Sequence, residues 1–292
     1  MNVKHFARAV VAGALAAFAG ACDSAAPLVA TNVESTFPAN VSTAAGTSVA
    51  QAPGVRVTNS RGKPVPGVKV TFAVTGGGGM IVGGDQTTGA DGKAGVVYWK
   101  LGNTSGVNTL TATAGSLPPV TITATGFGGP AVKLGVATAP SATATNRVAL
   151  PTQPVIQMLD QFGNANATST AQVSAALVSG SGTLGGTLTV AAVAGVATFT
   201  NLSVAGPAGS KTINFTSNDL TAVQATITTT AGAASSIAVS DGNNQSAQPG
   251  AAVAVPPSVI ITDADGNPVS GVGVTYAVTS GGGSVTGANP TS

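Results

Sequence analysis

Apolar and polar residues alternate in short runs along much of this chain. Between positions 68 and 74 every second residue is apolar, and the residues between them are lysine, threonine and alanine. Such alternation turns one side of a segment toward a core and the other toward solvent, so it predicts a β-strand. Comparable runs predict strands over residues 55–58, 80–82, 94–101, 107–113 and 120–125. About seven short strands with a turn signal every 8–12 residues are typical of a β-sandwich.

A second set of runs predicts another sandwich, with strands at 155–159, 171–178, 188–190, 196–202, 211–217 and 223–229. In addition, Pro53–Gly84 recurs without a gap at Pro257–Ala288, and more than half of the positions are identical. Self-similarity of this kind is the signature of tandem domains. We therefore predict an all-β chain of tandem sandwiches at residues 29–130, 131–233 and 234–292. The linkers, 126–130 and 231–234, are short, so we expect end-to-end stacking with limited bending.

The third unit is predicted to be incomplete. Ser292 aligns with Thr88 of the first unit, so the counterparts of residues 89–125, including three strands, are missing. Half a sandwich leaves unpaired strand edges and an open core. We expect the sequence to be a fragment of a longer product. A natural end with an incomplete last domain is the alternative.

Each unit carries the same turn signal between two predicted strands. A short polar side chain opens the turn, and a glycine that can adopt positive φ follows three residues later. Aromatic residues mark the predicted cores, and Trp99 and Phe199 occupy corresponding positions there. We expect both to fill the space between two sheets rather than to form an exposed platform for a carbohydrate. The turn pairs are Asn59 and Gly62, Asp160 and Gly163, and Asp263 and Gly266, and the core aromatics are Phe72, Trp99, Phe199 and Tyr276.

The first 21 residues have the pattern of a signal peptide, with a basic start followed by an apolar run that is too short to span a bilayer. The run ends in Ala19-Gly20-Ala21-Cys22, and Cys22 is the only cysteine of the chain. One interpretation is an ordinary signal peptide that is cut after Ala21. The other is a lipoprotein signal resembling the bacterial lipobox, in which Cys22 becomes the lipidated N-terminus. Residues 22–28 would then link the membrane to the first unit. The choice between the inner and the outer membrane stays open.

Charge excludes some partners. Only 7% of the residues are charged, and without Lys4 and Arg8 of the leader the basic residues equal the nine acidic ones in number. A neutral chain lacks the basic surface that nucleic-acid binding needs, so no nucleic-acid partner is predicted. A single cysteine also excludes a disulfide framework.

Candidate chemistry is sparse. His5 lies in the leader, so the mature chain has no histidine, and Glu34 is its only glutamate. We therefore predict no catalytic residue, no cofactor and no zinc site. Asp263 and Asp265 are the only close pair of acids, and they fall on the turn of the third unit. Turn capping is the first interpretation of this pair, and a weak calcium site at a domain junction is the alternative.

Three segments of the first unit resemble the bacterial Ig-like group 1 domain of intimins and invasins: Gly62–Phe72, Ala90–Ala94 and Trp99–Leu110. The stretch Asp263–Val272 matches the same pattern more closely. The second unit resembles a bacterial Ig-like domain with Asn164-Ala165 in place of Pro-Val and Phe199 in place of tryptophan. The resemblance implies immunoglobulin-like β-sandwiches, repeated in surface-exposed bacterial proteins that are often adhesins. It implies no receptor-binding residues, because the C-terminal lectin-like tip of those adhesins has no counterpart here.

These observations lead to two hypotheses about function. The first is a non-enzymatic surface lipoprotein, held in the membrane through Cys22, whose units form a spacer or adhesive stalk with a possible glycan or protein ligand. The alternative is the accessory region, for spacing or carbohydrate binding, of a longer secreted enzyme whose catalytic domain lies beyond Ser292. A cluster of Arg56, Arg61, Lys63 and Lys69 around one hairpin is a candidate contact for acidic glycans or anionic lipids, and solvated strand faces are the simpler explanation of these residues.

Overall fold

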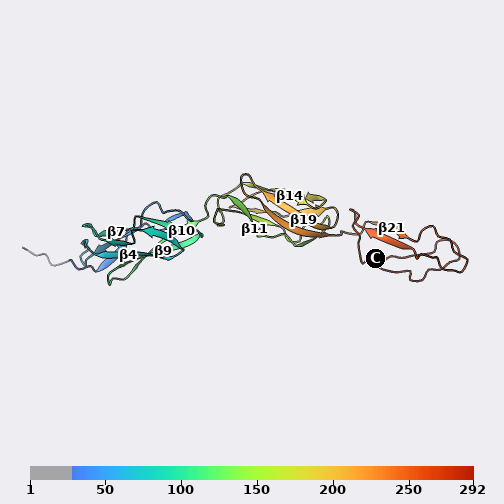
Figure 1. Cartoon of the computed structure of the whole chain (residues 1–292), viewed down its shortest axis with the longest axis horizontal. Helices are drawn as coiled ribbons and strands as arrows, with labels where there is room; N and C mark the ends of the chain where they lie inside the picture. The colour runs from blue at the N-terminus through green and yellow to red at the C-terminus, as the bar shows by residue number, and fades with distance from the viewer. Residues whose placement is uncertain (1–27) are drawn as a thin grey trace, which may run out of the picture.

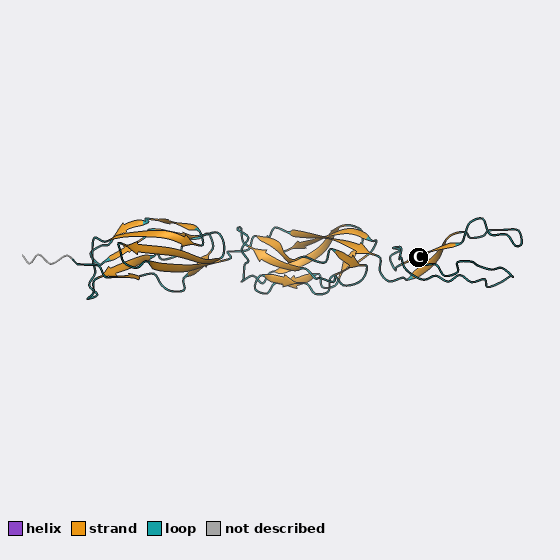
Figure 2. Ribbon diagram, turned by 90° about the horizontal axis from the view of Figure 1, so that it is seen from below, coloured by secondary structure: helices purple, strands orange, loops and turns teal. Residues whose placement is uncertain are grey.

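The structure, a computed structural model, describes residues 28–292. The predicted signal peptide, the proposed lipidation site at Cys22 and most of the first linker lie outside the described residues. The described part of the chain forms three bodies in a row along one axis, joined by single crossings of the chain (Figure 1). Each body is built from strands and loops (Figure 2). Among residues 28–292 no helix is long and apolar enough to cross a membrane.

Unit 1, the first body, is a sandwich of strands. Its larger sheet has the order β2-β10-β9-β4-β6, in which only the β2–β10 pair is parallel. The opposite layer holds the sheet β1-β3-β7 and the pair β5-β8. The strands are β1 (Asn32–Ser35), β2 (Ser42–Ala44), β3 (Gly54–Thr58), β4 (Lys69–Gly76), β5 (Gly79–Val82), β6 (Asp85–Thr87), β7 (Lys93–Gly95), β8 (Tyr98–Leu101), β9 (Gly106–Ala114) and β10 (Val120–Phe127).

Unit 2 repeats this topology strand for strand. Its larger sheet is β12-β20-β19-β14-β16, and the opposite layer holds β11-β13-β17 and the pair β15-β18. The strands are β11 (Lys133–Thr138), β12 (Thr143–Thr145), β13 (Val155–Leu159), β14 (Gln172–Ser179), β15 (Thr183–Gly185), β16 (Thr189–Ala191), β17 (Val196–Thr198), β18 (Ser203–Ala205), β19 (Gly209–Thr216) and β20 (Val223–Thr230). The predicted all-β fold of tandem sandwiches is confirmed by these sheets.

Aromatic residues lie in both cores, but the predicted correspondence of Trp99 with Phe199 is wrong. The Phe199 N–H donates to the Pro154 carbonyl as the Val96 N–H does to the Pro53 carbonyl, and Leu202 is the counterpart of Trp99. Trp99 is fully buried in unit 1, and its ring centroid lies 6.2 Å from that of Phe37. In unit 2, Phe199 is 1% exposed, with its ring centroid 5.5 Å from that of Phe215. Phe72 is buried as well. Burial of such large apolar side chains between two sheets is the main source of stability in a sandwich that has no disulfide.

One predicted strand is two strands. The sequence predicts a single strand over residues 94–101, but β7 pairs with β3 whereas β8 pairs with β5. The change occurs at two valines: the Val96 N–H donates to the Pro53 carbonyl, and the Val97 N–H donates to the Val82 carbonyl. The predicted strand at 196–202 is shorter in the structure, because β17 ends at Thr198 and the next strand, β18, begins only at Ser203. At the first break the buried positions shift by one residue, since Val96 and Trp99 are buried and the two residues between them are exposed. Residues 96–99 are all apolar, so the sequence pattern does not reveal the shift.

Unit 3 repeats only part of the plan among the described residues. Its strands β21 (Ser236–Asp241) and β22 (Ser258–Thr262) pair as β1 and β3 do, with Ile237 opposite Ile261 as Val33 is opposite Val57. However, Ile237 is 59% exposed and Val33 only 8%. Tyr276 is half-buried, which corrects the expectation of a core position. The reason is that no second layer of strands covers this side of unit 3 in the described structure.

Candidate functional site at the unit junctions

The turn that follows β3, β13 and β22 has the same internal geometry in all three units. Its first side chain accepts hydrogen bonds through one oxygen from the N–H groups two and four residues later. This arrangement explains the choice of Asn or Asp at the first position, and the glycine takes positive φ. The acceptors are Asn59 for Arg61 and Lys63, Asp160 for Phe162 and Asn164, and Asp263 for Asp265 and Asn267, and the glycine φ values are 72° at Gly62, 90° at Gly163 and 80° at Gly266.

In unit 2 the last residue of this turn reaches across to unit 1. Asn164 Oδ1 accepts a hydrogen bond of 2.7 Å from the Ser105 N–H, and its Nδ2 donates one of 2.8 Å to the Asn103 carbonyl. Both groups belong to the loop between β8 and β9. The Asn164 side chain is buried. The side-chain amide of Asn164 therefore binds one main-chain N–H group and one main-chain carbonyl group of unit 1.

The linker between units 1 and 2 is held by the same turn. Asp160 Oδ2 accepts a hydrogen bond of 3.0 Å from the Gly129 N–H and another of 2.9 Å from Asn164 Nδ2. Asn166 Nδ2 donates to the Gly129 carbonyl at 2.8 Å. Both main-chain groups of Gly129 are thus paired with unit 2. We call the contacts made by the first and last residues of the turn the peptide clasp. The contact of Asn166 adds to the clasp at this junction.

The second junction has the same peptide clasp. Asn267 Oδ1 accepts from the Ala208 N–H at 2.6 Å, and Asn267 Nδ2 donates to the Gly206 carbonyl at 3.1 Å. Asp263 Oδ2 accepts from the Gly232 N–H and from Asn267 Nδ2, each at 2.8 Å. Gly232 stands in this linker where Gly129 stands in the first. Asp-x-x-Gly-Asn thus performs the same task at both junctions.

Charged side chains surround the second clasp. Arg147 lies in unit 2, and its Nε and Nη2 donate to the two carboxylate oxygens of Asp265 at 2.7 Å and 2.6 Å. Asn146 Nδ2 donates to both Asp263 and Asp265. Asn146 Oδ1 accepts from the Gly206 N–H. Two neighbouring residues of unit 2 therefore bind both acids of the unit 3 turn.

These contacts shift the pKa values of the acids. Burial disfavours the Asp263 carboxylate, but hydrogen bonds from Asn267, the Gly232 N–H and Asn146 outweigh it and hold its pKa well below the usual range. The hydrogen bonds from Arg147 and then from Asn146 lower the pKa of Asp265 to about 2. At the first junction, burial again opposes ionisation of Asp160, while hydrogen bonds from Asn164 and the Gly129 N–H lower its pKa. All three carboxylates are therefore ionised at neutral pH.

No group of three or more acidic, histidine or cysteine side chains in residues 28–292 is placed to hold a metal ion. Asp263 and Asp265, the acids of the calcium alternative, instead accept hydrogen bonds from Asn146 and Arg147. The candidate site is a structural coupling between units.

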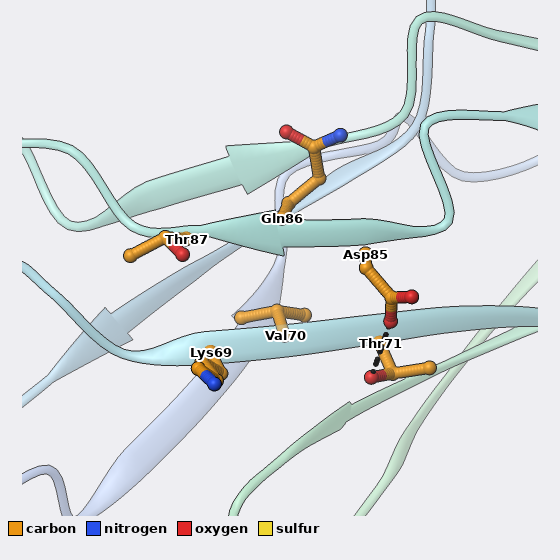
Figure 3. A pocket seen from close by; sticks show the side chains of 6 residues that line it. All are labelled: Lys69, Val70, Thr71, Asp85, Gln86 and Thr87. Carbon is orange, nitrogen blue, oxygen red and sulfur yellow. Dashed lines mark hydrogen bonds between the residues drawn. The ribbon is translucent and has the colours of Figure 1, made fainter.

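The predicted basic cluster does not form. Arg56 is exposed on β3, and Lys69 is exposed on β4. These strands belong to the two opposite sheets of the sandwich, so the side chains project from opposite faces. Beside Lys69, a shallow hollow lies between β4 and β6, where the Asp85 carboxylate turns toward Thr71 and accepts its hydroxyl hydrogen bond at 2.9 Å (Figure 3). Arg56 and Lys69 therefore do not share a surface, which agrees with solvated strand faces, the simpler explanation of these residues.

The sequence predicts the turns but not their use between units. Asn164 and Asn267 were missed, as were Asn146 and Arg147. One signal for the first two is present, because Asp-x-x-Gly-Asn occurs in the second and third copies whereas the first copy has Asn59-Ser60-Arg61-Gly62-Lys63. The structure thus aligns Asn164 with Lys63, which corrects its predicted alignment with a proline. Arg61 and Lys63 are exposed. The asparagine thus distinguishes the turns that contact a preceding unit.

No family model matches the sequence, and no curated protein matches it. Among solved structures, the Escherichia coli adhesin FdeC is similar to 84% of this chain over 80% of its own, with 18% identity and a TM-score of 0.48. The D00–D0 domain of intimin is similar to 68% of the chain over 99% of its own, with 18% identity and a TM-score of 0.36.

Enzymes also occur among the similar structures. A glycosyl hydrolase family 2 member from Bacteroides cellulosilyticus is similar to 66% of this chain, at 14% identity and a TM-score of 0.32, and the match spans only 24% of that enzyme. At these identities and TM-scores no match carries an argument about function. The fold follows from the sheets of the chain itself.

Proposed function

We propose that this chain is a non-enzymatic cell-surface lipoprotein whose Ig-like units form a spacer or adhesive stalk. The observation that carries the proposal is the peptide clasp, which occurs at both junctions with the same residue types. A stalk needs a coupling that keeps successive units aligned. The row of units along one axis supports the same interpretation (Figure 1).

The strength of the first clasp supports an aligned state. Four hydrogen bonds tie unit 2 to unit 1 and the linker: Asn164 accepts one and donates one, Asp160 accepts one, and Asn166 donates one. At about 1 kcal/mol net for each, they favour the docked arrangement by about 4 kcal/mol, or roughly a thousandfold. Independent swivelling of the units would break these bonds together.

Small-angle X-ray scattering tests the stalk. We expect one extended particle whose maximum dimension equals that of the described units in a row, at both low and moderate protein concentration. A broad ensemble of bent shapes, with a shorter mean dimension, would contradict an aligned stalk. This measurement needs no ligand and is independent of membrane attachment.

Membrane attachment is tested with the substitution Cys22→Ala. If Cys22 carries the lipid, this variant leaves the membrane fraction, while the neighbouring control Ser24→Ala stays in it. Metabolic labelling with a radioactive fatty acid should mark the wild type and the control only. Recovery of Cys22→Ala in washed membranes would refute the lipid anchor.

The function at the far end of the stalk has two candidates, a surface glycan or protein ligand and the catalytic domain of a secreted enzyme. The two differ in what the gene encodes after the Ser292 codon. Further Ig-like repeats would favour the stalk, and a catalytic domain would favour the accessory role. In either case the clasps would set the distance between the membrane and that element.

A further inference from the structure

Beside each peptide clasp lies one additional pair of facing residues, and the residue types of this pair differ between the two junctions. One member follows the second strand of the preceding unit, at Gly46 or Arg147. The other is the third residue of the turn in the following unit, at Phe162 or Asp265. Both Gly46 and Arg147 have positive φ, 73° and 64°. The backbone therefore has a similar conformation at these two positions, and the two junctions differ there only in the side chains.

At the first junction the pair is a glycine facing an aromatic ring. A Cβ atom added to Gly46 would lie 2.5 Å from Cε2 of Phe162 and 2.9 Å from Oδ1 of Asn103. Real Cβ contacts are longer than this, so any side chain at position 46 would displace the ring. The ring and the glycine are matched in shape.

At the second junction the pair is an ion pair. Arg147 binds Asp265 through two nitrogens, one on each carboxylate oxygen. A bidentate pair of this kind fixes the orientation of both groups as well as attracting them. It is the only salt bridge within residues 28–292. The two side chains at the second junction are thus complementary in charge and in orientation.

The two pairs exclude each other. An arginine at position 46 would meet the Phe162 ring, and an aspartate at position 162 would face Gly46, which offers no donor side chain. An aromatic ring at position 265 would leave Arg147 without its acceptor. Discrimination of this kind depends on the mismatched combinations as much as on the matched ones.

We propose that these two positions decide which unit docks on which, while the peptide clasp supplies the common attraction. The clasp binds main-chain groups, which are the same in every unit, so it cannot discriminate between one unit and another. The matched side-chain pair provides that discrimination. We call the end of a unit that contacts the following unit its exit face. The exit face of unit 1, with Gly46, therefore accepts a turn whose third residue is aromatic, and the exit face of unit 2, with Arg147, accepts a turn whose third residue is acidic.

The turn of unit 1 supports this division. It carries Arg61 at the third position and Lys63 in place of the clasping asparagine. Against the exit face of unit 2, Arg61 would meet Arg147, and like charges repel. Lys63 has no acceptor oxygen for the main-chain N–H that an asparagine would bind. Unit 1 of a second copy is thus unsuited to dock on unit 2.

A double-mutant cycle at the first junction tests the proposal. The variants are Gly46→Arg, Phe162→Asp and the two together, in full-length protein with Cys22→Ala so that cysteines can be placed for spin labels at Thr123 and Thr226. Both of these threonines are exposed strand residues in units 1 and 2. The distance distribution between the labels reports whether the units are docked.

We expect each single substitution to lower the ratio of docked to undocked molecules roughly tenfold, as is typical of a contacting pair. The double variant, which installs the pair of the second junction, is expected to recover most of this loss. The strain of a non-glycine residue at position 46 is tolerable, because Arg147 already adopts that backbone conformation. Gly115→Arg is the matched control, since Gly115 also has positive φ and has no atom within 4 Å of an added Cβ.

Either of two results would overturn the proposal. One is a double variant no better docked than the weaker single variant, which would mean that the pair has no mutual preference. The other is wild-type docking in both single variants, which would leave the peptide clasp sufficient by itself. Circular dichroism and thermal unfolding of each variant establish that the sandwiches remain folded.

Discussion

The junction between units 1 and 2 and the junction between units 2 and 3 share a peptide clasp but differ in charge. At the first, the single carboxylate of Asp160 is surrounded by amide and main-chain donors. At the second, Asp263 and Asp265 face Asn146 and Arg147. The comparison separates what every junction needs from what distinguishes one junction from another. The shared part consists of contacts to peptide groups, and the variable part consists of side-chain pairs.

Removing the clasping amide should have the largest effect, and it should be equal at the two junctions. Asn164→Ala and Asn267→Ala each delete two hydrogen bonds to the preceding unit and leave its main-chain N–H and carbonyl groups without these partners. We expect a loss of about 2–3 kcal/mol in the free energy of docking at the altered junction. Distances between spin labels at Thr123 and Thr226 report the first junction, and labels at Thr226 and Ala238 report the second.

Asn218→Ala provides the control for both amide substitutions, because Asn218 is an exposed loop residue of unit 2. It should leave both distance distributions as they are in the wild type. A loss at only one of the two junctions would contradict the idea of a shared clasp.

Acid should open the second junction more steeply than the first. Groups across the junctions contribute to the lowered pKa values: the Gly129 N–H for Asp160, the Gly232 N–H and Asn146 for Asp263, and Arg147 and then Asn146 for Asp265. The contribution of these carboxylates to docking is therefore complete above the ordinary pKa of aspartate, about 3.9, and is lost as the pH falls toward the lower values of the docked state. Undocking takes up as many as two protons at the second junction and one at the first. The fraction docked should thus fall about twice as steeply with pH at the second junction.

The same two pairs of labels, followed from neutral pH to about pH 2.5, measure these slopes. Circular dichroism at each pH monitors the fold of the sandwiches, so that undocking is not confused with unfolding. Equal slopes at the two junctions would show that Asp265 takes no part in docking.

Removing one charge should affect the second junction alone. Asp265→Asn keeps the size of the side chain but weakens the bidentate contact with Arg147, which is itself exposed to solvent. We expect a severalfold loss of docking there and none at the first junction. Raised salt should reduce this difference between wild type and variant, since mobile ions screen an exposed pair. Persistence of the full difference in 1 M salt would argue against an electrostatic cause.

Exchanging one core aromatic for the other should change the least. The Trp99 indole N–H is buried without a hydrogen-bond partner among the described residues, and unit 2 has the apolar, buried Leu202 at the corresponding position. Trp99→Phe removes this unpaired donor but also removes contact area, so we expect the free energy of unfolding to change by about 1 kcal/mol or less. Trp99→Ala, by comparison, should cost about 3–5 kcal/mol. Chemical denaturation measures both, and both label distances should be unchanged in Trp99→Phe.

The sequence predicts the local structure of the turns well because their causes are local. Asn59, Asp160 and Asp263 each accept N–H groups two and four residues ahead, and a glycine with positive φ follows. The partners of Asn164 lie about 60 residues earlier in the chain and are peptide groups of a loop. Peptide groups are the same in every residue, so no pattern of side chains indicates which of them an amide will meet.

The two strand breaks were missed for a related reason. Alternation of apolar residues records which side of a segment faces the core, but the phase of that alternation shifts by one residue where the chain passes from one strand partner to another at Val96 and Val97. The shift lies within an unbroken apolar run, residues 96–99, which hides it in the sequence. The exposure of Tyr276 and Ile237 depends instead on strands that are distant in sequence, and in unit 1 the strand β10 lies against β1. Composition and spacing thus predict the faces of strands better than their neighbours.

Contact with peptide groups has a consequence for how such an array can evolve. If a gene segment encoding one unit is duplicated, the new copy brings its own Asp-x-x-Gly-Asn turn and meets a loop whose main chain it can already bind. The extra unit is therefore accommodated from the first generation, without compensating mutations in its neighbours. Later changes at the residues corresponding to Gly46 and Phe162 would then let the copies diverge and fix their order, so length can be gained first and specificity afterwards.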